Sequence, residues 1–262
     1  MTSKTIIAII NTISKAGQAM LDIYESGDFG IERKADNSPL TLADQAANKM
    51  IIETLEKMDY PILSEEGKSI EYKDRKHWDK FWLVDPLDGT KEFIKKNGEF
   101  TINIAFIENG QATTGFVYAP ILKDFYLGIN KETALKFTLE VGEQINKLPT
   151  NAQILKVQKP QKEVMVVASR SHFNKETEAF INQLKEEYSK VDFISKGSSL
   201  KLCMVAEGTA HIYPRFGPTM EWDTAAAHAV VTAAGGQVLT PEGEELLYNK
   251  ENLLNPFFIV KG

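Results

Sequence analysis

Two aspartates and a threonine follow directly after a short apolar stretch of the chain. Residues 81–84 are Phe-Trp-Leu-Val, and residues 85–90 read Asp-Pro-Leu-Asp-Gly-Thr. Proline cannot donate to a strand ladder and glycine permits turns that other residues resist, so the strand should end by presenting Asp85, Asp88 and Thr90 together. Two neighbouring carboxylates repel each other unless a cation or a proton lies between them. Oxygen ligands without histidine or cysteine suit Mg²⁺, so the run predicts a magnesium site that could bind phosphate.

Three more acidic residues stand at predicted element boundaries: Asp44, Glu65 and Asp223. Each also has a purely structural explanation. Asp44 could complete a capping box with Thr41, Asp223 could cap the alanine-rich helix that follows it, and Glu65 could belong to an exposed turn with Glu66. Considered together with the aspartate pair, they predict a cage of oxygen ligands for metal. A helix beginning at residue 223 would also direct the N–H groups of residues 224 and 225 towards a bound anion.

The chain lacks the sequence signals of several other catalytic sites. It has no glycine-rich phosphate loop of the P-loop or Rossmann type and no Gly-x-Ser-x-Gly elbow. Cys203 has no arginine at the spacing of a cysteinyl-phosphate loop, which disfavours a phosphocysteine route. No two histidines have a paired metal-ligand spacing, so zinc is not expected; they are His77, His172, His211 and His228.

The overall charge narrows the class of partner. The 262 residues carry a net charge of −6, which argues against nucleic acid or an anionic membrane as the main partner. A bound cation and a few local lysines or arginines could still reverse the field around a small anionic ligand. The single cysteine, Cys203, excludes an internal disulfide. We therefore expect a cytoplasmic protein, and we find no segment long and apolar enough to span a bilayer.

The hydrophobic pattern predicts how these residues are positioned. In the first part of the chain it predicts helices over 3–24 and 42–58, a short strand at 62–63, an exposed charged loop over 68–80, and strands over 81–84, 100–108, 112–118, 125–129 and 135–139. Asn109-Gly110 is the strongest hairpin signal. In the second part it predicts strands over 164–168, 191–194, 210–213, 237–239 and 257–260, with helices over 175–187, 199–207 and 224–234.

This order of elements predicts an α/β protein with two lobes. The stretch 143–163 is polar and contains two prolines, so we place the boundary there. The α+β lobe of residues 1–155 carries the Asp-Pro-Leu-Asp-Gly-Thr run. The lobe of residues 156–262 alternates strands and helices, as α/β folds do, and it carries Asp223.

In these motifs the chain resembles a known family, the inositol monophosphatase superfamily of Mg²⁺-dependent, lithium-sensitive phosphatases. The resemblance rests on the run 85–90, on Glu65-Glu66 and on the segment Trp-Asp-Thr-Ala-Ala at 222–226. Longer stretches are similar to its bacterial branch of CysQ-type 3′(2′),5′-bisphosphate nucleotidases. They are residues 34–39, 63–66, 82–95, 97–101, 197–201 and 213–219. The similarity covers nearly the whole chain, although residues 130–163 carry no signature.

The resemblance implies a layered αβαβα sandwich of the inositol monophosphatase and sugar phosphatase type, with two to three Mg²⁺ ions in its site. One ion would be held by Glu65, Asp85 and the carbonyl of Leu87. A second would be held by Asp85, Asp88 and Asp223, and a third, looser one by Glu65 and water. The implied reaction cleaves 3′-phosphoadenosine 5′-phosphate to AMP and phosphate, in the setting of sulfate assimilation.

The resemblance also assigns roles around the metal site. Catalytic roles fall to Asp44, Thr90 and Glu65, with Thr90 paired to Asp44 and orienting an attacking water. Contacts to the phosphate would come from Glu65, Leu87, Asp88, Gly89, Thr90 and Asp223. Ser198, Lys201 and Arg215 would hold the nucleotide and its second phosphate, and His172 would add a further contact. For Lys201 and Arg215 the residue type and the predicted position support the same assignment. Lys201 follows Ser198 at a predicted helix start, so both can contact one ligand. Arg215 follows a predicted strand end, where the N–H donors of its guanidinium group could bind a phosphate.

Two other functions stay open at this point. The same chemistry could act on an inositol or sugar phosphate, or the chain could be a nucleotide sensor without catalysis. The intact acidic set argues against the sensor. Peripheral attachment to the inner membrane follows only from the family analogy, because no basic amphipathic segment supports it. The number of chains in the assembly, monomer or homodimer, is also open.

Overall fold

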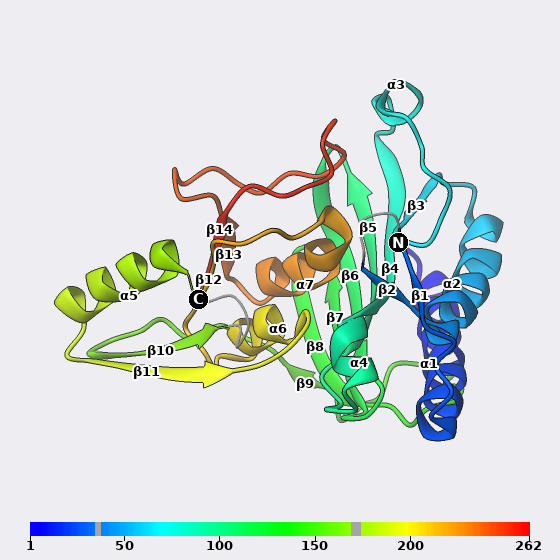
Figure 1. Ribbon diagram of the computed structural model, residues 1–262, viewed down its shortest axis with the longest axis horizontal. Coiled ribbons are helices and arrows are strands. Elements are labelled where there is room, and N and C mark those ends of the chain that lie inside the picture. The colour runs from blue at the N-terminus through cyan, green and yellow to red at the C-terminus, as the bar shows by residue number, and fades with distance from the viewer. Residues whose placement is uncertain (35–37, 169–173) are drawn as a thin grey trace.

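Helices and sheets alternate in five layers through the computed structural model of the chain (Figure 1). The structure describes residues 1–34, 38–168 and 174–262. In these ranges α1 and α2 form the first layer, a seven-stranded sheet the second, α6 and α7 the third, a five-stranded sheet the fourth and α5 the fifth. This is the predicted αβαβα sandwich.

The first layer is a pair of packed helices. Helix α1 (Ser3–Ser26) begins after Thr2, whose hydroxyl accepts from the N–H of Thr5, and ends at Gly27 in the left-handed conformation. Helix α2 (Leu42–Leu55) is followed by one turn of 3₁₀ helix at η1 (Glu56–Met58), so the predicted α-helix is one turn too long. Both helices bury an apolar face against the large sheet, at residues that include Ile9, Ile13, Ala47 and Ile51.

Helix α1 also corrects an expectation. By length and composition alone this helix could cross a membrane, although the sequence reading found no such segment. Its apolar residues, however, lie in the cluster shared with the sheet, and Ile10 and Met20 are fully buried. We therefore interpret it as a core helix of the sandwich.

The large sheet has the strand order β3-β4-β5-β6-β7-β8-β9. Only the β3–β4 pair is parallel; the other pairs are antiparallel, so β4 to β8 form a meander. The predicted hairpin at residues 109–110 joins β5 to β6. The bounds are β3 Ile62–Ser64, β4 Lys80–Asp88, β5 Thr101–Glu108, β6 Gln111–Ala119, β7 Asp124–Ile129, β8 Thr133–Thr138 and β9 Gln153–Ile154.

Helix α7 (Glu221–Ala233) crosses the second face of this sheet at very short range. Two glycines make the approach possible. A Cβ added to Gly115 on β6 would lie 2.0 Å from the carbonyl oxygen of Ala226, and one on Gly128 of β7 would lie 2.6 Å from that of Ala229. Neither space can hold a methyl group. The glycines therefore set how close α7 lies to the sheet, and with it the position of Asp223.

The small sheet has the order β11-β10-β12-β14-β13. Its bounds are β10 Glu163–Ala168, β11 Lys190–Ser195, β12 Ile212–Arg215, β13 Gln237–Leu239 and β14 Phe258–Lys261. Helix α6 (Leu200–Glu207) packs with α7 between the two sheets, and α5 (Lys175–Glu187) covers the outer face. A two-stranded ribbon of β1 (Glu32–Arg33) and β2 (Pro39–Leu40) precedes α2.

The charged segment 68–80 is not simply an exposed loop. It contains the one-turn helix α3 (Tyr72–Arg75), and Arg75 is only 2% exposed. The guanidinium donates to Oδ1 of Asn249 and to the carbonyls of Lys250 and Glu251. The segment is therefore tied to a loop almost 180 residues further along the chain. The hydrophobic periodicity of the sequence cannot predict a contact between segments this far apart.

Candidate metal and phosphate site

Strand β4 continues past its apolar part through an irregularity at the acidic run. Asp85 pairs with Asn103 and Asp88 with Thr101, so two residues of β4, Pro86 and Leu87, face one of β5. The predicted end at residue 84 is thus too early. Proline fits such a bulge because it has no N–H to place in the ladder. The bulge lies between the two aspartates, and the carbonyl of Leu87 within it is 3.3 Å from the Thr90 hydroxyl.

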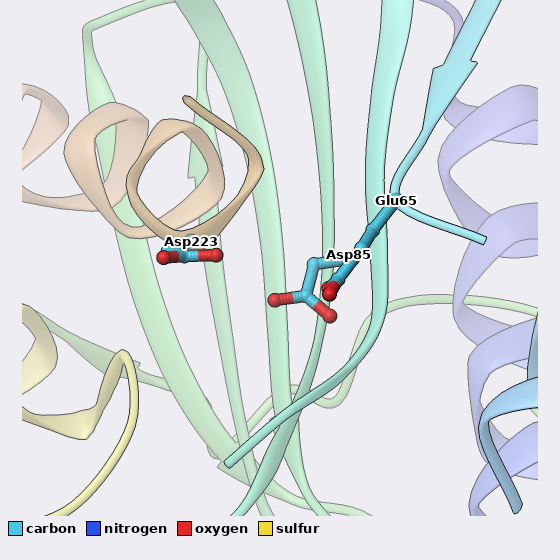
Figure 2. A group of neighbouring side chains, drawn as sticks. All are labelled: Glu65, Asp85 and Asp223. Atoms are coloured by element: carbon cyan, nitrogen blue, oxygen red, sulfur yellow. The ribbon is translucent and has the colours of Figure 1, made fainter. Parts of the chain in front are cut away.

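Three carboxylates from separate elements meet at this point. Glu65 directly follows β3, Asp85 is on β4, and Asp223 is in the first turn of α7 (Figure 2). Their nearest oxygens all lie within 4.8 Å of one another. Carboxylate oxygens gathered this closely could hold one divalent cation in common. The structure thereby brings together three of the five residues that the sequence analysis assigned to metal binding.

Among the described residues neither Asp85 nor Asp223 forms a salt bridge, whereas Glu65 has one. Burial raises the pKa of Asp85 well above its usual range, and the neighbouring Glu65, Asp88 and Asp223 raise it further. Burial, followed by the charge of Asp88, likewise raises the pKa of Asp223. Oδ1 of Asp85 accepts from the N–H of Leu87 at 3.0 Å, whereas the buried Oδ2 has no partner. An unpartnered anionic oxygen in an acidic cluster fits a hard divalent cation, so the donor set suits Mg²⁺.

Asp223 is not the N-cap that the sequence suggested. Helix α7 begins two residues earlier, and Oδ2 of Asp223 accepts from the N–H of Met220 at 2.9 Å in a capping box. Thr224 and Ala225 therefore lie inside the helix, and their N–H groups are not the free ones at its start. The N–H of Glu221 donates instead to the carbonyl of Leu253.

Asp88 lies beside the three-carboxylate group and is held by α6. Its Oδ2 accepts from both the N–H of Ser199, at 2.6 Å, and the Ser199 hydroxyl, at 2.9 Å. That hydroxyl also lies 2.8 Å from the carbonyl of Asp223. Ser199 is only 1% exposed. The sequence analysis missed this residue, because it weighed only the neighbouring Ser198 in the Gly-Ser-Ser-Leu-Lys segment.

Thr90 and Asp44 are in contact, as expected from the family. The Thr90 hydroxyl lies 3.4 Å from Oδ1 of Asp44 and 3.3 Å from the carbonyl of Leu87. Oδ2 of Asp44 accepts from the N–H and hydroxyl of Thr41, at 2.7 and 2.6 Å, which is the predicted capping box. Asp44 therefore serves two purposes at once. Gly89, with φ +94°, supplies the left-handed turn before Thr90.

Lys34 is a second residue that the sequence analysis did not place in the site. Its ammonium donates to Oε1 of Glu65 at 2.7 Å and to Glu66. Burial lowers the pKa of Lys34, but the two glutamates outweigh burial and raise it above its usual value. The contacts join residues more than 30 positions apart, so no local sequence signal could have found them.

A cavity lies next to the acids and contains the predicted anion-binding residues. Ser198, Lys201 and Arg215 line it together with Asp88 and Asp223. Lys201 and Arg215 are 7% and 9% exposed. Burial lowers the pKa of Lys201 to about 8, although Asp88 opposes this shift. Nη2 of Arg215 donates to the carbonyl of Pro218, whereas its buried Nε has no partner. Two buried cations with spare donors suit phosphate.

One predicted contact cannot be placed. His172 lies outside the described residues, in the gap between 168 and 174. The other predicted site residues surround either the acids or the adjoining cavity. Within the part of the chain that the structure describes, the site is a carboxylate cluster at one end and a cationic pocket at the other. Asp223 belongs to both, and Asp88 lines the pocket beside the cluster.

Known proteins match the chain along nearly its whole length. The model of the inositol monophosphatase family matches residues 1–256. A Salmonella typhimurium protein named 3′(2′),5′-bisphosphate nucleotidase CysQ is 46% identical over 249 residues, which cover 94% of each chain. A Haemophilus influenzae protein of the same name is 32% identical over 257 residues, covering 94% of this chain and 91% of that one.

Solved structures give the same result. The crystal structure of CysQ from Bacteroides thetaiotaomicron, described as a bacterial member of the inositol monophosphatase family, is 46% identical with a TM-score of 0.89. The match covers 99% of this chain and 97% of that one. A Thermotoga maritima IMPase, 24% identical with a TM-score of 0.71 over 96% of this chain and 89% of its own, shares the fold.

Proposed function

The chain belongs to the inositol monophosphatase family, and from this premise we propose that it is a 3′(2′),5′-bisphosphate nucleotidase. The substrate would be 3′-phosphoadenosine 5′-phosphate, and the products AMP and inorganic phosphate. The observation that carries the proposal is the pairing of two charge environments: a carboxylate cluster and, beside it, a cavity with two buried cations. A substrate with two phosphates needs both, one for the phosphate that is cleaved and one for the phosphate that is kept.

The acids fit the role of magnesium ligands. In the proposal Glu65, Asp85 and the Leu87 carbonyl hold one ion, and Asp85, Asp88 and Asp223 hold a second. A third, looser ion at Glu65 would compete with the Lys34 ammonium for the same carboxylate. When bound, Mg²⁺ supplies an acidified water and neutralises the charge of the phosphate and of the departing oxygen. Asp85 belongs to both sets, in agreement with its unpartnered oxygen.

The other residues would orient the reactants. The Thr90 hydroxyl, which lies against Asp44, is placed to position the attacking water and to pass its proton to that carboxylate. Burial raises the pKa of Asp44, although its hydrogen bonds to Thr41 oppose this shift, so the carboxylate is a better base than an exposed aspartate. The reaction is a direct in-line displacement, and no residue has to form a covalent intermediate.

Lys201, Arg215 and Ser198 would bind the 5′-phosphate and the nucleoside. Lys201 already donates to the Ser198 carbonyl at 2.6 Å, so part of the cationic pocket is formed before the substrate enters. Pre-positioned donors lower the entropic cost of binding. An inositol monophosphate has one phosphate only and would leave these two buried cations without an anionic partner.

A comparison of substrates tests the proposal. Phosphate release would be measured for 3′-phosphoadenosine 5′-phosphate and for inositol 1-phosphate, each with Mg²⁺ and with excess chelator. We expect kcat/KM to favour the nucleotide by at least about 100-fold, since an unpaired charged group costs several kcal/mol, and we expect no turnover with chelator. Equal kcat/KM values would contradict the nucleotide assignment, and metal-independent turnover would contradict the metal assignment.

The cellular location is a proposal of its own. The single cysteine, Cys203, is buried and free, in agreement with a reducing compartment such as the cytoplasm. Nothing in the described residues supports peripheral attachment to a membrane.

A further inference from the structure

A glutamate lines the same cavity that holds the buried cations. Glu92 lies on the short helix α4 (Thr90–Ile94), two residues after Thr90. It lines the pocket that the proposed function assigns to an anionic substrate, and it interacts electrostatically with Lys201. A negative side chain at this place repels a phosphate group, so phosphate binding alone does not explain it.

The carboxylate of Glu92 has free hydrogen-bonding capacity. Among the described residues no hydrogen bond or salt bridge to it is formed, whereas Glu99 nearby accepts from the N–H of Gly197 and pairs with Lys196. The backbone approaches Glu92 closely here: a Cβ on Gly197 would lie 3.1 Å from its Cγ. The side chain is half-buried, with its Cγ against Gly197 in the turn that precedes α6, and the residue lines the cavity.

The cavity therefore contains hydrogen-bond donors and a hydrogen-bond acceptor on different residues. Lys201 and Arg215 present only donors, which suit phosphate oxygens, and Glu92 presents only acceptors, which suit neutral O–H or N–H groups. A nucleoside offers such groups where it carries no phosphate, at the ribose 2′-hydroxyl and at the adenine amino group. A ligand oriented by both ends can bind in one direction only.

We propose that Glu92 is a specificity residue that accepts a hydrogen bond from an uncharged donor of the nucleoside. This inference rests on the proposed function, since it names the part of the nucleotide that the pocket reads. It also predicts that the pocket disfavours a phosphate next to Glu92, because like charges repel and Glu92 forms no salt bridge among the described residues.

Kinetics of enzyme variants on substrate analogues, measured in every combination, test the proposal. kcat/KM would be measured for adenosine 3′,5′-bisphosphate, its 2′-deoxy analogue and inosine 3′,5′-bisphosphate, with wild type, Glu92→Gln and Glu92→Ala. The 2′-deoxy analogue removes the hydroxyl and the inosine analogue removes the amino group, so the two arms distinguish the two donors. Glu53→Gln is the matched control, because it removes one negative charge from the exposed side of α2.

We expect one analogue to lose about 10- to 100-fold in kcat/KM with wild type, as for a hydrogen bond to a charged group. With Glu92→Ala the same analogue should react as well as the full nucleotide, and Glu92→Gln should lie between, since an amide oxygen accepts more weakly. Glu53→Gln should behave as wild type. Losses that are the same in wild type and Glu92→Ala, for both analogues, would overturn the assignment of Glu92. If wild type hydrolyses inositol 1-phosphate but no nucleotide, the proposed nucleotidase function itself is wrong. That outcome is distinct from a nucleotidase whose specificity does not depend on Glu92.

Discussion

Ser199 donates two hydrogen bonds to one oxygen of Asp88, its N–H at 2.6 Å and its hydroxyl at 2.9 Å. The same hydroxyl lies 2.8 Å from the carbonyl of Asp223. One buried side chain thus links the bulge of β4, the start of α6 and the first turn of α7. The β4 bulge and α7 carry members of the carboxylate cluster, and the start of α6 lines the adjoining cavity. If Asp88 holds a metal ion as proposed, such a partner orients the ligand oxygen, and its loss typically costs about 10- to 100-fold in metal affinity.

Replacing this hydroxyl tests the link. In Ser199→Ala the backbone N–H still holds Asp88, so we expect the fold to persist, while the Mg²⁺ concentration for half-maximal activity rises about 10-fold. Magnesium titrations of phosphate release would measure the shift, with circular dichroism as a check of the fold. Ser195→Ala, on the exposed end of β11, is the matched control. An unchanged magnesium dependence would show that the backbone bond alone positions Asp88.

Asp85 is the acid on which both proposed ions depend. In Asp85→Asn we expect Mg²⁺-dependent turnover to fall by at least about 1,000-fold, since a neutral amide is a much weaker ligand for a divalent cation than a carboxylate. Without metal, the free energy of unfolding should stay equal or increase, because the change removes one of several mutually repelling buried charges. Urea unfolding in chelator measures this, with Asp79→Asn as an exposed control. Turnover at the wild-type rate would disprove the metal assignment.

Thr90 is predicted to act in the transition state rather than in binding. Thr90→Ala should lower kcat about 100-fold and leave KM within a factor of about three, because it removes a group that orients water. Thr90→Ser keeps the hydroxyl that lies near Asp44 and should recover most of kcat. Steady-state kinetics on the nucleotide measure both variants. A change confined to KM would assign Thr90 to substrate binding only.

Gly115 is predicted to control the distance between α7 and the large sheet. In Gly115→Ala the new methyl group would occupy space 2.0 Å from the Ala226 carbonyl oxygen, so the helix must move. Overpacking of this kind costs about 3 kcal/mol in the free energy of unfolding, and it should shift Asp223 and weaken Mg²⁺ binding as well. Urea unfolding and magnesium titration measure the two effects. Wild-type stability would mean that the helix adjusts without cost.

His228 on α7 predicts how stability depends on pH. Burial lowers the pKa of His228 to about 3, and its Nδ1 lies 2.8 Å from the Tyr248 hydroxyl. The unfolded chain, with an ordinary histidine pKa, therefore binds a proton that the folded chain does not. The neutral His228 therefore stabilises the fold fully only above the unfolded pKa of about 6.5. The free energy of unfolding should fall by about 1.5 kcal/mol between pH 6.5 and 5, as the unfolded chain takes up the proton. Urea unfolding over this range should show a shallower slope for His228→Gln, and equal slopes would contradict the prediction.

Much of the fold could be read from the sequence because its signals are local. The apolar spacing in α1, the capping box of Thr41 and Asp44, and the Asn109-Gly110 hairpin each involve residues a few positions apart. The acidic run 85–90 was identifiable for the same reason, since its residue types and spacing already indicate the chemistry. Even here the boundaries were displaced where a bulge extended β4 and where α7 began earlier than Asp223.

The tertiary structure decided which of these groups meet. Glu65, Asp85 and Asp223 come from three elements, and only the close packing of α7 over Gly115 brings the last of them to the first two. Ser199 and Lys34 owe their hydrogen bonds, and Glu92 owes its place in the cavity, to packing between distant segments, which leaves no periodic trace in the chain. The sequence determined which chemical groups were present, because residue types are local; their distances, burial and shifted pKa values depend on packing between remote segments.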